Sequence, residues 1–322
     1  MPNSLGYRYS GFLLLLCFFA LLRSPPASAT EYNFSDLLAF YDYDPSQPLN
    51  ATENLVETTY LHKRYDITFQ SVHGETVTGI LIKPQWYWAG FGPFPVIMYL
   101  HGYGGSSTID EWVNDILYVV EILSAEPYII LAIDAQYHGG RSVPGRDMFS
   151  LNFTQDRTGL ATTVMDERRA VDYLQSRPDV IPDQIHLIGV SMGALLGAMT
   201  ISVEHRFAAA ALIVGGGNWT ELVSNSQLPP AIPMREALND HYETIPRYFD
   251  MVDPVILIPN ASPHVALQMH NGTLDDVVPT GQLLYDAAGP PKQIYWYTAD
   301  HYTIALYAID IIQRSLDWFA QY

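Results

Sequence analysis

Short apolar segments recur along the chain from residue 65 onwards. Tyr65, Ile67 and Phe69 alternate with polar residues, and Gly74 lies in a turn before a second run at 76–82, which predicts an antiparallel hairpin. Six further apolar runs have the length and composition of buried parallel strands. These runs are 96–100, 129–133, 185–188, 209–214, 265–269 and 294–297. Together with the hairpin they predict a sheet of eight strands.

Between these runs lie longer segments in which apolar residues recur at three- and four-residue spacing, the pattern of helices with one buried face. They are 109–124, 158–175, 192–203, 280–286 and 302–319. Strands that alternate with helices of this length imply right-handed crossovers. The sequence therefore predicts an α/β fold with a mostly parallel, eight-stranded sheet and helices on both faces.

The chain is expected to divide into a leader, an N-terminal arm and one large domain. Residues 30–64 are polar, contain prolines and are weakly periodic, so they predict an arm with a short helix at 34–40. Residues 65–322 hold the alternating strands and helices. Two insertions follow strand ends in that domain, at 136–155 and 216–253, and the second is predicted to form a small helical cap over the ligand crevice.

Residues 1–29 have the pattern of a signal peptide. Arg8 precedes an unbroken apolar run from Phe12 to Leu22, and small residues end the segment at 27–29. The run is shorter than the roughly 20 residues that span a bilayer, so a cleaved leader is favoured over a membrane anchor. A secreted or otherwise extracytoplasmic protein is expected, without stable membrane association after cleavage.

Composition narrows the possible chemistry. Apolar residues make up 48% of the chain and charged residues 16%, which suits a large buried core. Cys17 is the only cysteine and lies in the predicted leader, so the mature chain is expected to hold no disulfide, cysteine nucleophile or cysteine-based zinc site. The formal net charge of −18 would repel nucleic acid and anionic lipid, and neither is expected as a partner.

Three other histidines do not predict a metal site. His138, His264 and His270 lack the helical i, i+4 spacing and the H-E-x-x-H context of zinc ligands. No metal and no cofactor are therefore expected. Asp134, His138 and Arg141 follow the run at 129–133 and are interpreted as residues that order a loop rather than as catalytic groups.

The strongest chemical signal surrounds Ser191. The sequence Gly189-Val190-Ser191-Met192-Gly193 directly follows an apolar run and opens an alanine- and leucine-rich helix. A sharp strand-to-helix turn crowds the backbone, so glycines are needed two residues before and two residues after the nucleophile. This nucleophile elbow predicts that the Ser191 hydroxyl stands at the edge of the sheet.

A serine hydroxyl needs a base to accept its proton and a carboxylate to orient that base. The turn after the run at 265–269 presents Asp275 and Asp276, and the spacing from Gly272 favours Asp275 as the acid. His301 is the only histidine after the last predicted strand. The chain order serine, aspartate, histidine, with each residue at a strand end, predicts a catalytic triad of Ser191, Asp275 and His301.

Hydrogen-bond donors for a developing oxyanion are expected beside the serine. H-G-Y-G-G at 101–105 directly follows an apolar run, and its glycines allow the backbone to approach a substrate. The backbone N–H groups of Tyr103 and Met192 are the candidate donors. The Tyr103 ring and Trp219, in the predicted cap, are candidate substrate-binding side chains, and the His101 imidazole is interpreted as a loop anchor.

From about residue 65 to residue 319 the chain resembles the α/β-hydrolase superfamily, particularly its dienelactone-hydrolase-like, acetyl-esterase-like and prolyl-oligopeptidase-like branches. The motifs that carry the resemblance are H-G-Y-G-G at 101–105, D-A-Q-Y-H-G-G-R at 134–141, G-V-S-M-G at 189–193, G-T-L-D-D-V-V-P at 272–279 and D-H-Y at 300–302. The resemblance implies the α/β-hydrolase fold, with Ser191 as the nucleophile, Asp275 as the acid and His301 as the base.

The residues and the resemblance together predict a secreted carboxylesterase that cleaves small acyl or acetyl esters through an acyl-serine intermediate, with a small-molecule ester as its partner. A serine aminopeptidase or amidase with the same triad is the alternative within enzymes. A hydrolase-fold binding protein without catalysis is the alternative of another class. For an enzyme, activity is expected to fall in acid, because the base must be neutral to accept the serine proton.

Overall fold

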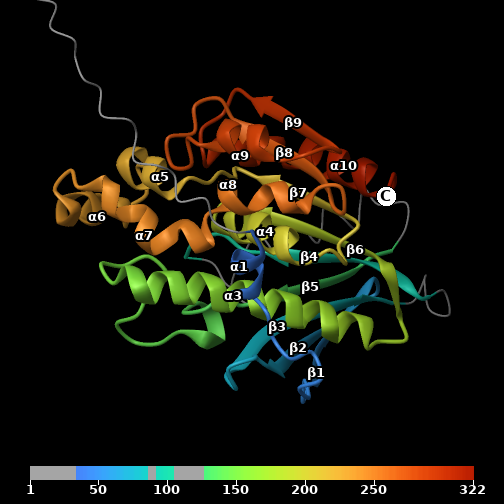
Figure 1. The fold of residues 1–322 in the computed structure, drawn as a ribbon. Helices are drawn as coiled ribbons and strands as arrows, with labels where there is room; N and C mark the ends of the chain where they lie inside the picture. Colours follow the sequence, from blue (N-terminus) through green and yellow to red (C-terminus); the bar gives the residue numbers. More distant parts are fainter. Residues whose placement is uncertain (1–33, 86–91, 105–126) are drawn as a thin grey trace, which may run out of the picture.

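A mixed sheet of nine strands runs through the molecule in the order β1-β2-β3-β5-β4-β6-β7-β8-β9. The structure is a computed structural model that describes residues 34–85, 92–104 and 127–322. The strands are β1 (Thr52–Thr58), β2 (His62–Gln70), β3 (Thr76–Pro84), β4 (Phe94–Leu100), β5 (Ile129–Ile133), β6 (Val180–Val190), β7 (Ala209–Ile213), β8 (Ala266–Gly272) and β9 (Lys292–Tyr297). Figure 1 shows them stacked from β1 at the bottom to β9 at the top. Pairs from β1 to β5 are antiparallel, and pairs from β5 to β9 are parallel.

Helices cover both faces of the sheet. Outside the cap they are α1 (Phe34–Ala39), α3 (Phe153–Gln175), α4 (Met192–Val203), α8 (Pro254–Leu257), α9 (Gly281–Ala287) and α10 (Ala308–Phe319). On one face α4 packs against β4, β6 and β7, with α3 beside it. On the other face α10 packs against β7 and β8. In Figure 1, α3 lies in front of the sheet.

Two separate apolar cores lie on the two faces of the sheet. On β4, the side chains of Val96, Met98 and Leu100 join the core that also contains the apolar residues of α3 and α4. Those of Ile97 and Tyr99 join the core that contains the apolar residues of α10. All five side chains are buried, because helices cover the sheet on both sides. This two-sided burial explains the unbroken apolar runs in the sequence.

The predicted α/β architecture is confirmed. Each of the six apolar runs predicted as parallel strands corresponds to one of the strands β4 to β9. Four predicted helices correspond to α3, α4, α9 and, at the C-terminus, a 3-10 turn η6 (Thr303–Tyr307) followed by α10. The helix predicted at 109–124 lies outside the described residues.

The sheet has one strand more than the eight that the sequence predicts. The additional strand, β1, comes from the segment 30–64 that is predicted as an arm. All seven residues of β1 are exposed, Leu55 and Val56 among them, so the strand has no buried face and no apolar alternation to reveal it. Backbone pairing with β2 holds it in place. The sheet therefore begins before residue 65, whereas the helix predicted at 34–40 is confirmed as α1.

The segment predicted as a cap, 216–253, contains the helices α5 (Trp219–Asn225), α6 (Ala231–Leu238) and α7 (Ile245–Phe249). They lie at the left in Figure 1. The Asp253 carboxylate accepts hydrogen bonds from the N–H groups of Asn218, Trp219 and Val255, each at 2.9 Å. Burial raises the pKa of Asp253, and these three donors oppose that rise. A single buried carboxylate thus fastens both ends of the cap.

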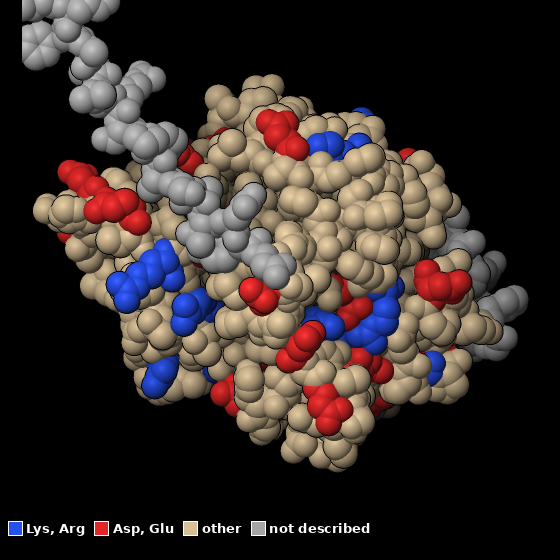
Figure 2. Space-filling model, viewed as in Figure 1, with Lys and Arg blue, Asp and Glu red and all other residues tan. Residues whose placement is uncertain are grey.

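Charged side chains beside α3 are grouped in clusters of mixed sign. Arg206 pairs with Asp172 at 2.7 Å and with Glu204 at 2.5 Å, and Arg168 also reaches Glu204, at 3.5 Å. Figure 2 shows acidic and basic side chains next to one another on the face that α3 covers. Acidic residues outnumber basic ones in this chain, whose net charge is −18, and these arginines each lie close to a carboxylate.

Among the residues that the structure describes, no helix is long and apolar enough to cross a membrane. Residues 1–29, predicted as a signal peptide, lie outside the described residues. The secreted location stays a prediction from the sequence.

Glu167, in α3, is buried and accepts a hydrogen bond from the Thr200 hydroxyl of α4. Burial raises the pKa of its carboxyl from 4.5 to about 8. The unfolded chain therefore loses this proton at lower pH than the folded chain, and the free energy of unfolding falls as the pH rises from 4.5 to about 8. Glu167→Gln should remove this contribution, which amounts to about 1.4 kcal/mol per pH unit in that interval.

Urea unfolding of the wild type and of Glu167→Gln at several pH values between about 5 and about 8 measures the difference. Glu57→Gln is the matched control, because Glu57 is exposed on β1, and it should keep the pH dependence of the wild type. Parallel curves for the wild type and Glu167→Gln would contradict the prediction.

Candidate active site

Ser191 stands on the sharp turn between β6 and α4. Its φ of 56° lies in the left-handed region, which a non-glycine residue adopts only with backbone strain. A Cβ atom on Gly189 would lie 2.3 Å from the Gly193 carbonyl oxygen, and one on Gly193 would lie 2.1 Å from the Leu100 carbonyl oxygen. The turn can be this tight only because both positions are glycine. The Ser191 N–H donates to the Ile213 carbonyl at 2.9 Å, which fixes the turn against β7.

The structure brings Ser191, His301 and Asp275 together from three separate loops. Ser191 Oγ lies 2.8 Å from His301 Nε2, and His301 Nδ1 lies 2.9 Å from Asp275 Oδ2. Because an ionised carboxylate can only accept, Nδ1 carries the proton and donates to Asp275. Nε2 then accepts from the Ser191 hydroxyl. The two hydrogen bonds have the directions that a serine nucleophile and its base require.

Asp275, and not Asp276, faces the imidazole. The Asp275 side chain is only 2% exposed, whereas Asp276 is open to solvent. Asp275 Oδ1 accepts hydrogen bonds from the N–H groups of Val277 and Val278, both at 2.9 Å. These bonds aim Oδ2 at His301. The geometry thus selects one of the two adjacent carboxylates between which the sequence offers a choice.

Backbone hydrogen bonds join the acid loop (residues 272–279) to the base loop (residues 298–303). The Thr273 N–H donates at 2.8 Å to the last carbonyl of β9, and the Leu274 N–H donates at 3.0 Å to a carbonyl of the base loop. The carboxylate and the imidazole are therefore held in register by the main chain as well as by their own hydrogen bond.

Asp300 shapes the base loop. Its Oδ1 atom accepts hydrogen bonds from the N–H groups of Tyr302 at 2.9 Å and Thr303 at 2.7 Å. Hydrogen bonds from Thr303 hold the pKa of the Asp300 carboxyl below its ordinary value. The sequence alone does not reveal this role, because the turn is recognised only once the conformation of the loop is known.

The two candidate oxyanion donors lie beside the serine. Met192 is the first residue of α4, where N–H groups have no partner within the helix. Tyr103 follows Gly102, and a Cβ atom on Gly102 would lie 3.7 Å from Ser191 Cβ. Tyr103, Ser191 and Met192 also line one cavity together. Both backbone N–H groups therefore stay candidates for stabilising an oxyanion.

His101 fastens the loop that carries Tyr103. Its Nε2 atom accepts a hydrogen bond from the Ala135 N–H at 3.1 Å, and Nδ1–H donates to the Gly102 carbonyl at 2.9 Å. Burial lowers the pKa of His101 to about 4, so the ring is neutral and can donate and accept at once. The interpretation of His101 as a loop anchor is confirmed.

The Tyr103 side chain is held by residues of the insertion at 136–155. Its phenol donates to Asp147 Oδ2 at 2.8 Å, and its ring centre lies 5.5 Å from that of Phe149 and 6.0 Å from that of His138. Burial, together with the bond to Asp147, raises the pKa of Tyr103. No sequence motif singles out Asp147, because it is distant in sequence from the residue that it holds.

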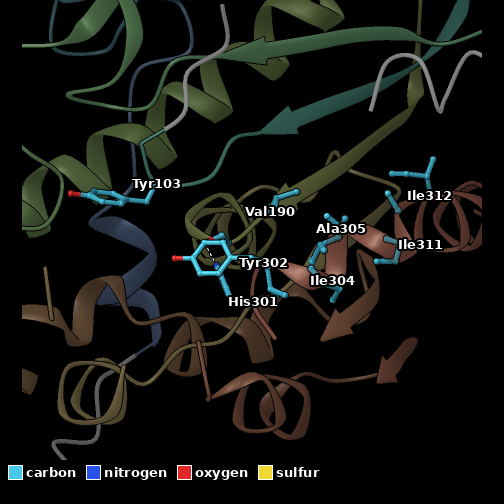
Figure 3. A pocket seen from close by; sticks show the side chains of 12 residues that line it. Tyr103, Val190, His301, Tyr302, Ile304, Ala305, Ile311 and Ile312 are labelled. Atoms are coloured by element: carbon cyan, nitrogen blue, oxygen red, sulfur yellow. Dashed lines mark hydrogen bonds between the residues drawn. The ribbon is translucent and has the colours of Figure 1, made fainter. Parts of the chain in front are cut away.

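Two cavities open beside Ser191, and Tyr103 lines both. The cap cavity lies beneath α5 and α6, where Trp219, a predicted substrate-binding residue, forms part of its wall. The histidine cavity lies beside His301, along η6 and α10. Figure 3 shows Tyr103 on one side of His301 and Ile311 on the other.

Asp134, His138 and Arg141 make contacts within and around their own loop. Arg141 Nη1 lies 2.7 Å from the buried carboxylate of Asp166, and Asp134 Oδ2 accepts from the Gly140 N–H at 3.0 Å. His138 Nδ1 lies 2.9 Å from a carbonyl oxygen of the same loop. All three side chains are buried. These contacts agree with the interpretation that the three residues order a loop.

In the described part of the chain, no three or more His, Cys, Asp or Glu side chains are grouped so as to hold a metal ion. His264 stacks on His205 with ring centres 4.1 Å apart, and His270 Nδ1 lies 3.0 Å from the Tyr297 hydroxyl. That the protein works without metal or cofactor stays a prediction.

Solved structures share this fold. The acetyl xylan esterase from Paenibacillus sp. R4 superposes with a TM-score of 0.70 at 18% identity, over 88% of this chain and 92% of that chain. The acetyl xylan esterase 1 from Thermoanaerobacterium sp. JW/SL YS485 has a TM-score of 0.70 at 17% identity, over 88% and 93%. The acylaminoacyl peptidase of Pyrococcus horikoshii has a TM-score of 0.61 at 15% identity, over 81% of this chain and 41% of that chain. At these identities the likeness concerns the fold alone.

Curated proteins match part of the chain in sequence. YtaP of Bacillus subtilis (strain 168) is 28% identical over 165 residues, 48% of this chain and 50% of that protein. Rv2307c of Mycobacterium tuberculosis, an uncharacterized protein, is 30% identical over 167 residues, 51% of this chain and 49% of that protein. The chain spans about half the length of the curated relatives that it matches.

The fold and the placement of the loops are those of a hydrolase of the α/β class. The sequence profile of the alpha/beta hydrolase family matches residues 97–320, a span that includes Ser191, Asp275 and His301. The chain belongs to the alpha/beta hydrolase family.

The tight turn at Ser191 predicts different effects on stability for substitutions at Gly193 and Gly102, two glycines that lie near it in space. Gly193→Ala should lower the free energy of unfolding by about 3 kcal/mol or more, because its Cβ atom would overlap the main chain at Leu100. Gly102→Ala, whose Cβ atom would make an ordinary contact of 3.7 Å with Ser191, should change that free energy by less than about 1 kcal/mol. Denaturant unfolding of both variants measures the difference. Similar stability of the two variants would show that the turn is looser than described.

Proposed function

We propose that this chain is a serine carboxylesterase that cleaves small acyl esters through an acyl-serine intermediate. The proposal rests on the hydrogen bonds from Ser191 Oγ to His301 Nε2, at 2.8 Å, and from His301 Nδ1 to Asp275, at 2.9 Å, where two largely apolar cavities meet. Two of the structural neighbours are named acetyl xylan esterases, which fits ester hydrolysis.

In the first half of the reaction, His301 Nε2 takes the proton from Ser191 Oγ while Oγ attacks the carbonyl carbon of the ester. The carbonyl electron pair moves to oxygen, and the N–H groups of Met192 and Tyr103 stabilise the resulting oxyanion. When the oxyanion collapses, the bond to the alkoxy oxygen breaks and His301 gives its proton to the departing alcohol. Ser191 then carries the acyl group as an ester.

In the second half, His301 takes a proton from water as the water oxygen attacks the acyl carbon. The second oxyanion collapses, the bond to Ser191 Oγ breaks, and His301 returns the proton to Oγ. The carboxylic acid leaves and the enzyme is restored. Asp275 keeps the imidazole in the tautomer with Nδ1 protonated and stabilises the imidazolium that forms in each half.

The cavity walls favour esters over peptides with a free amine. An aminopeptidase has to neutralise the ammonium group of its substrate, which a nearby carboxylate does best. Among the described residues, neither cavity is lined by an Asp or Glu side chain. A binding protein without catalysis would have no need of a serine, imidazole and carboxylate in hydrogen-bonded sequence.

We also propose that the protein is exported. This part of the proposal rests on the signal-peptide pattern of residues 1–29 alone. N-terminal sequencing of the protein produced by its host tests whether the leader is removed.

The two adjacent aspartates provide a matched test of the triad. Asp275→Asn should lower kcat for p-nitrophenyl acetate by about 10³- to 10⁴-fold, because the imidazole loses the carboxylate that fixes its tautomer. Asp276→Asn makes the same chemical change at an exposed position and should leave kcat within about twofold of the wild type. Steady-state kinetics on variants shown to be folded by circular dichroism gives both values. Full activity of Asp275→Asn, or equal losses in the two variants, would overturn the assignment of Asp275.

A further inference from the structure

Two cavities meet at Ser191 and Tyr103, because these two residues line both of them. The Tyr103 side chain is held in place by its neighbours. Its phenol donates to Asp147 at 2.8 Å, and its centre lies 5.5 Å from that of Phe149. A substrate held at Ser191 can therefore extend in two separate directions.

The cap cavity has an apolar wall. Side chains from α4, α5 and α6 form it, among them Leu195, Trp219 and Met234. The Ser226 hydroxyl, which also lies in the wall, already donates to the Val277 carbonyl at 2.6 Å. The cavity has a volume of ≈ 50 Å³. Such a volume suits a short apolar group.

The histidine cavity is larger and also apolar. Ile213 and Val214 at the end of β7 form one part of its wall, and Ile304, Ile311 and Ile312 of η6 and α10 form another (Figure 3). None of the described residues that line it is Asp, Glu, Lys or Arg. Its volume of ≈ 160 Å³ is about three times the ≈ 50 Å³ of the cap cavity.

The reaction itself decides which half of an ester occupies which cavity. The departing alkoxide must receive its proton from His301 Nε2, so the alcohol half has to lie on the side of His301. His301 lines the histidine cavity and not the cap cavity. The acyl half stays on Ser191 after the alcohol has left, and it is held beside Met192, which lines only the cap cavity.

Resting on the proposed esterase function, we propose that the cap cavity binds the acyl half and the histidine cavity binds the alcohol half of the ester. The substrates are esters of a short apolar acyl group with a larger apolar alcohol. Sugar alcohols fit these walls poorly, because their hydroxyl groups would leave water without gaining hydrogen bonds.

Three esters separate the two halves of the substrate: methyl acetate, n-hexyl acetate and n-hexyl octanoate, with hydrolysis followed by acid release at constant pH. For the wild type, kcat/KM should be at least about 100-fold higher for hexyl acetate than for methyl acetate, because each buried methylene contributes about fourfold. It should be at least about tenfold lower for hexyl octanoate than for hexyl acetate, because the long acyl chain exceeds the cap cavity.

Two variants alter one cavity each. Leu228→Ala enlarges the cap cavity and should raise the octanoate-to-acetate ratio of kcat/KM by about tenfold without changing the hexyl-to-methyl ratio. Ala305→Phe fills the histidine cavity and should lower the hexyl-to-methyl ratio by about tenfold without changing the acyl preference. Ile232→Ala and Leu306→Phe are the controls, because these side chains are 44% and 84% exposed, and both ratios should stay at their wild-type values.

The outcomes distinguish this inference from the function on which it rests. If the wild type hydrolyses none of the esters, the esterase proposal fails and the inference fails with it. If hydrolysis depends on Ser191 but both ratios are flat, or if Leu228→Ala and Ala305→Phe exchange their effects, the esterase stands and the assignment of the cavities is wrong. Faster hydrolysis of a monoacetylated sugar with free hydroxyl groups than of hexyl acetate would contradict the proposal that the alcohol half is apolar.

Discussion

The close contact between the start of α4 and the end of β4 determines where the other parts of the site can lie. With glycine at positions 189 and 193, the helix begins against the Leu100 carbonyl and leaves Ser191 at a φ of 56°. Such a conformation costs about 1–3 kcal/mol and persists only where the surroundings enforce it. Here they do, because every residue from Met192 to Ser202 is buried. Ser191 therefore stands at the start of a helix that is buried along almost its whole length.

The remaining parts of the site are held together by hydrogen bonds of polar groups on loops. The acid and base loops share backbone hydrogen bonds, Asp147 holds the Tyr103 ring, and Asp253 ties both ends of the cap together. Each of these carboxylates accepts hydrogen bonds from groups that lie far from it in the sequence or at the opposite end of an insertion. Donors and acceptors that are already in place need no reorganisation during a reaction, which is the main way in which enzymes stabilise developing charge. The proposed placement of the alcohol half beside His301 and of the acyl half beside Met192 depends on the fixed positions of these two residues.

What the sequence predicts well is what local physical constraints determine. Short apolar runs predict β4 to β9, and the two glycines around Ser191 predict the elbow, because only glycine fits so tight a turn. β1 escapes prediction because all its residues are exposed, so no apolar alternation marks it in the sequence. The choice of Asp275 over Asp276 depends on how the loop turns, and the role of Asp147 depends on a contact across 44 residues. The two cavities arise from side chains of many elements, so no single segment of the sequence encodes them.

The central claim is that Ser191 becomes covalently acylated. Reaction of the folded protein with a fluorophosphonate, followed by peptide mass spectrometry, tests it most directly, because such a reagent is attacked by an activated serine and remains on it. One adduct on the peptide that contains Ser191, absent from a folded Ser191→Ala variant, is the predicted result. A folded wild-type protein that gains no adduct, or an adduct that persists in Ser191→Ala, would contradict the account.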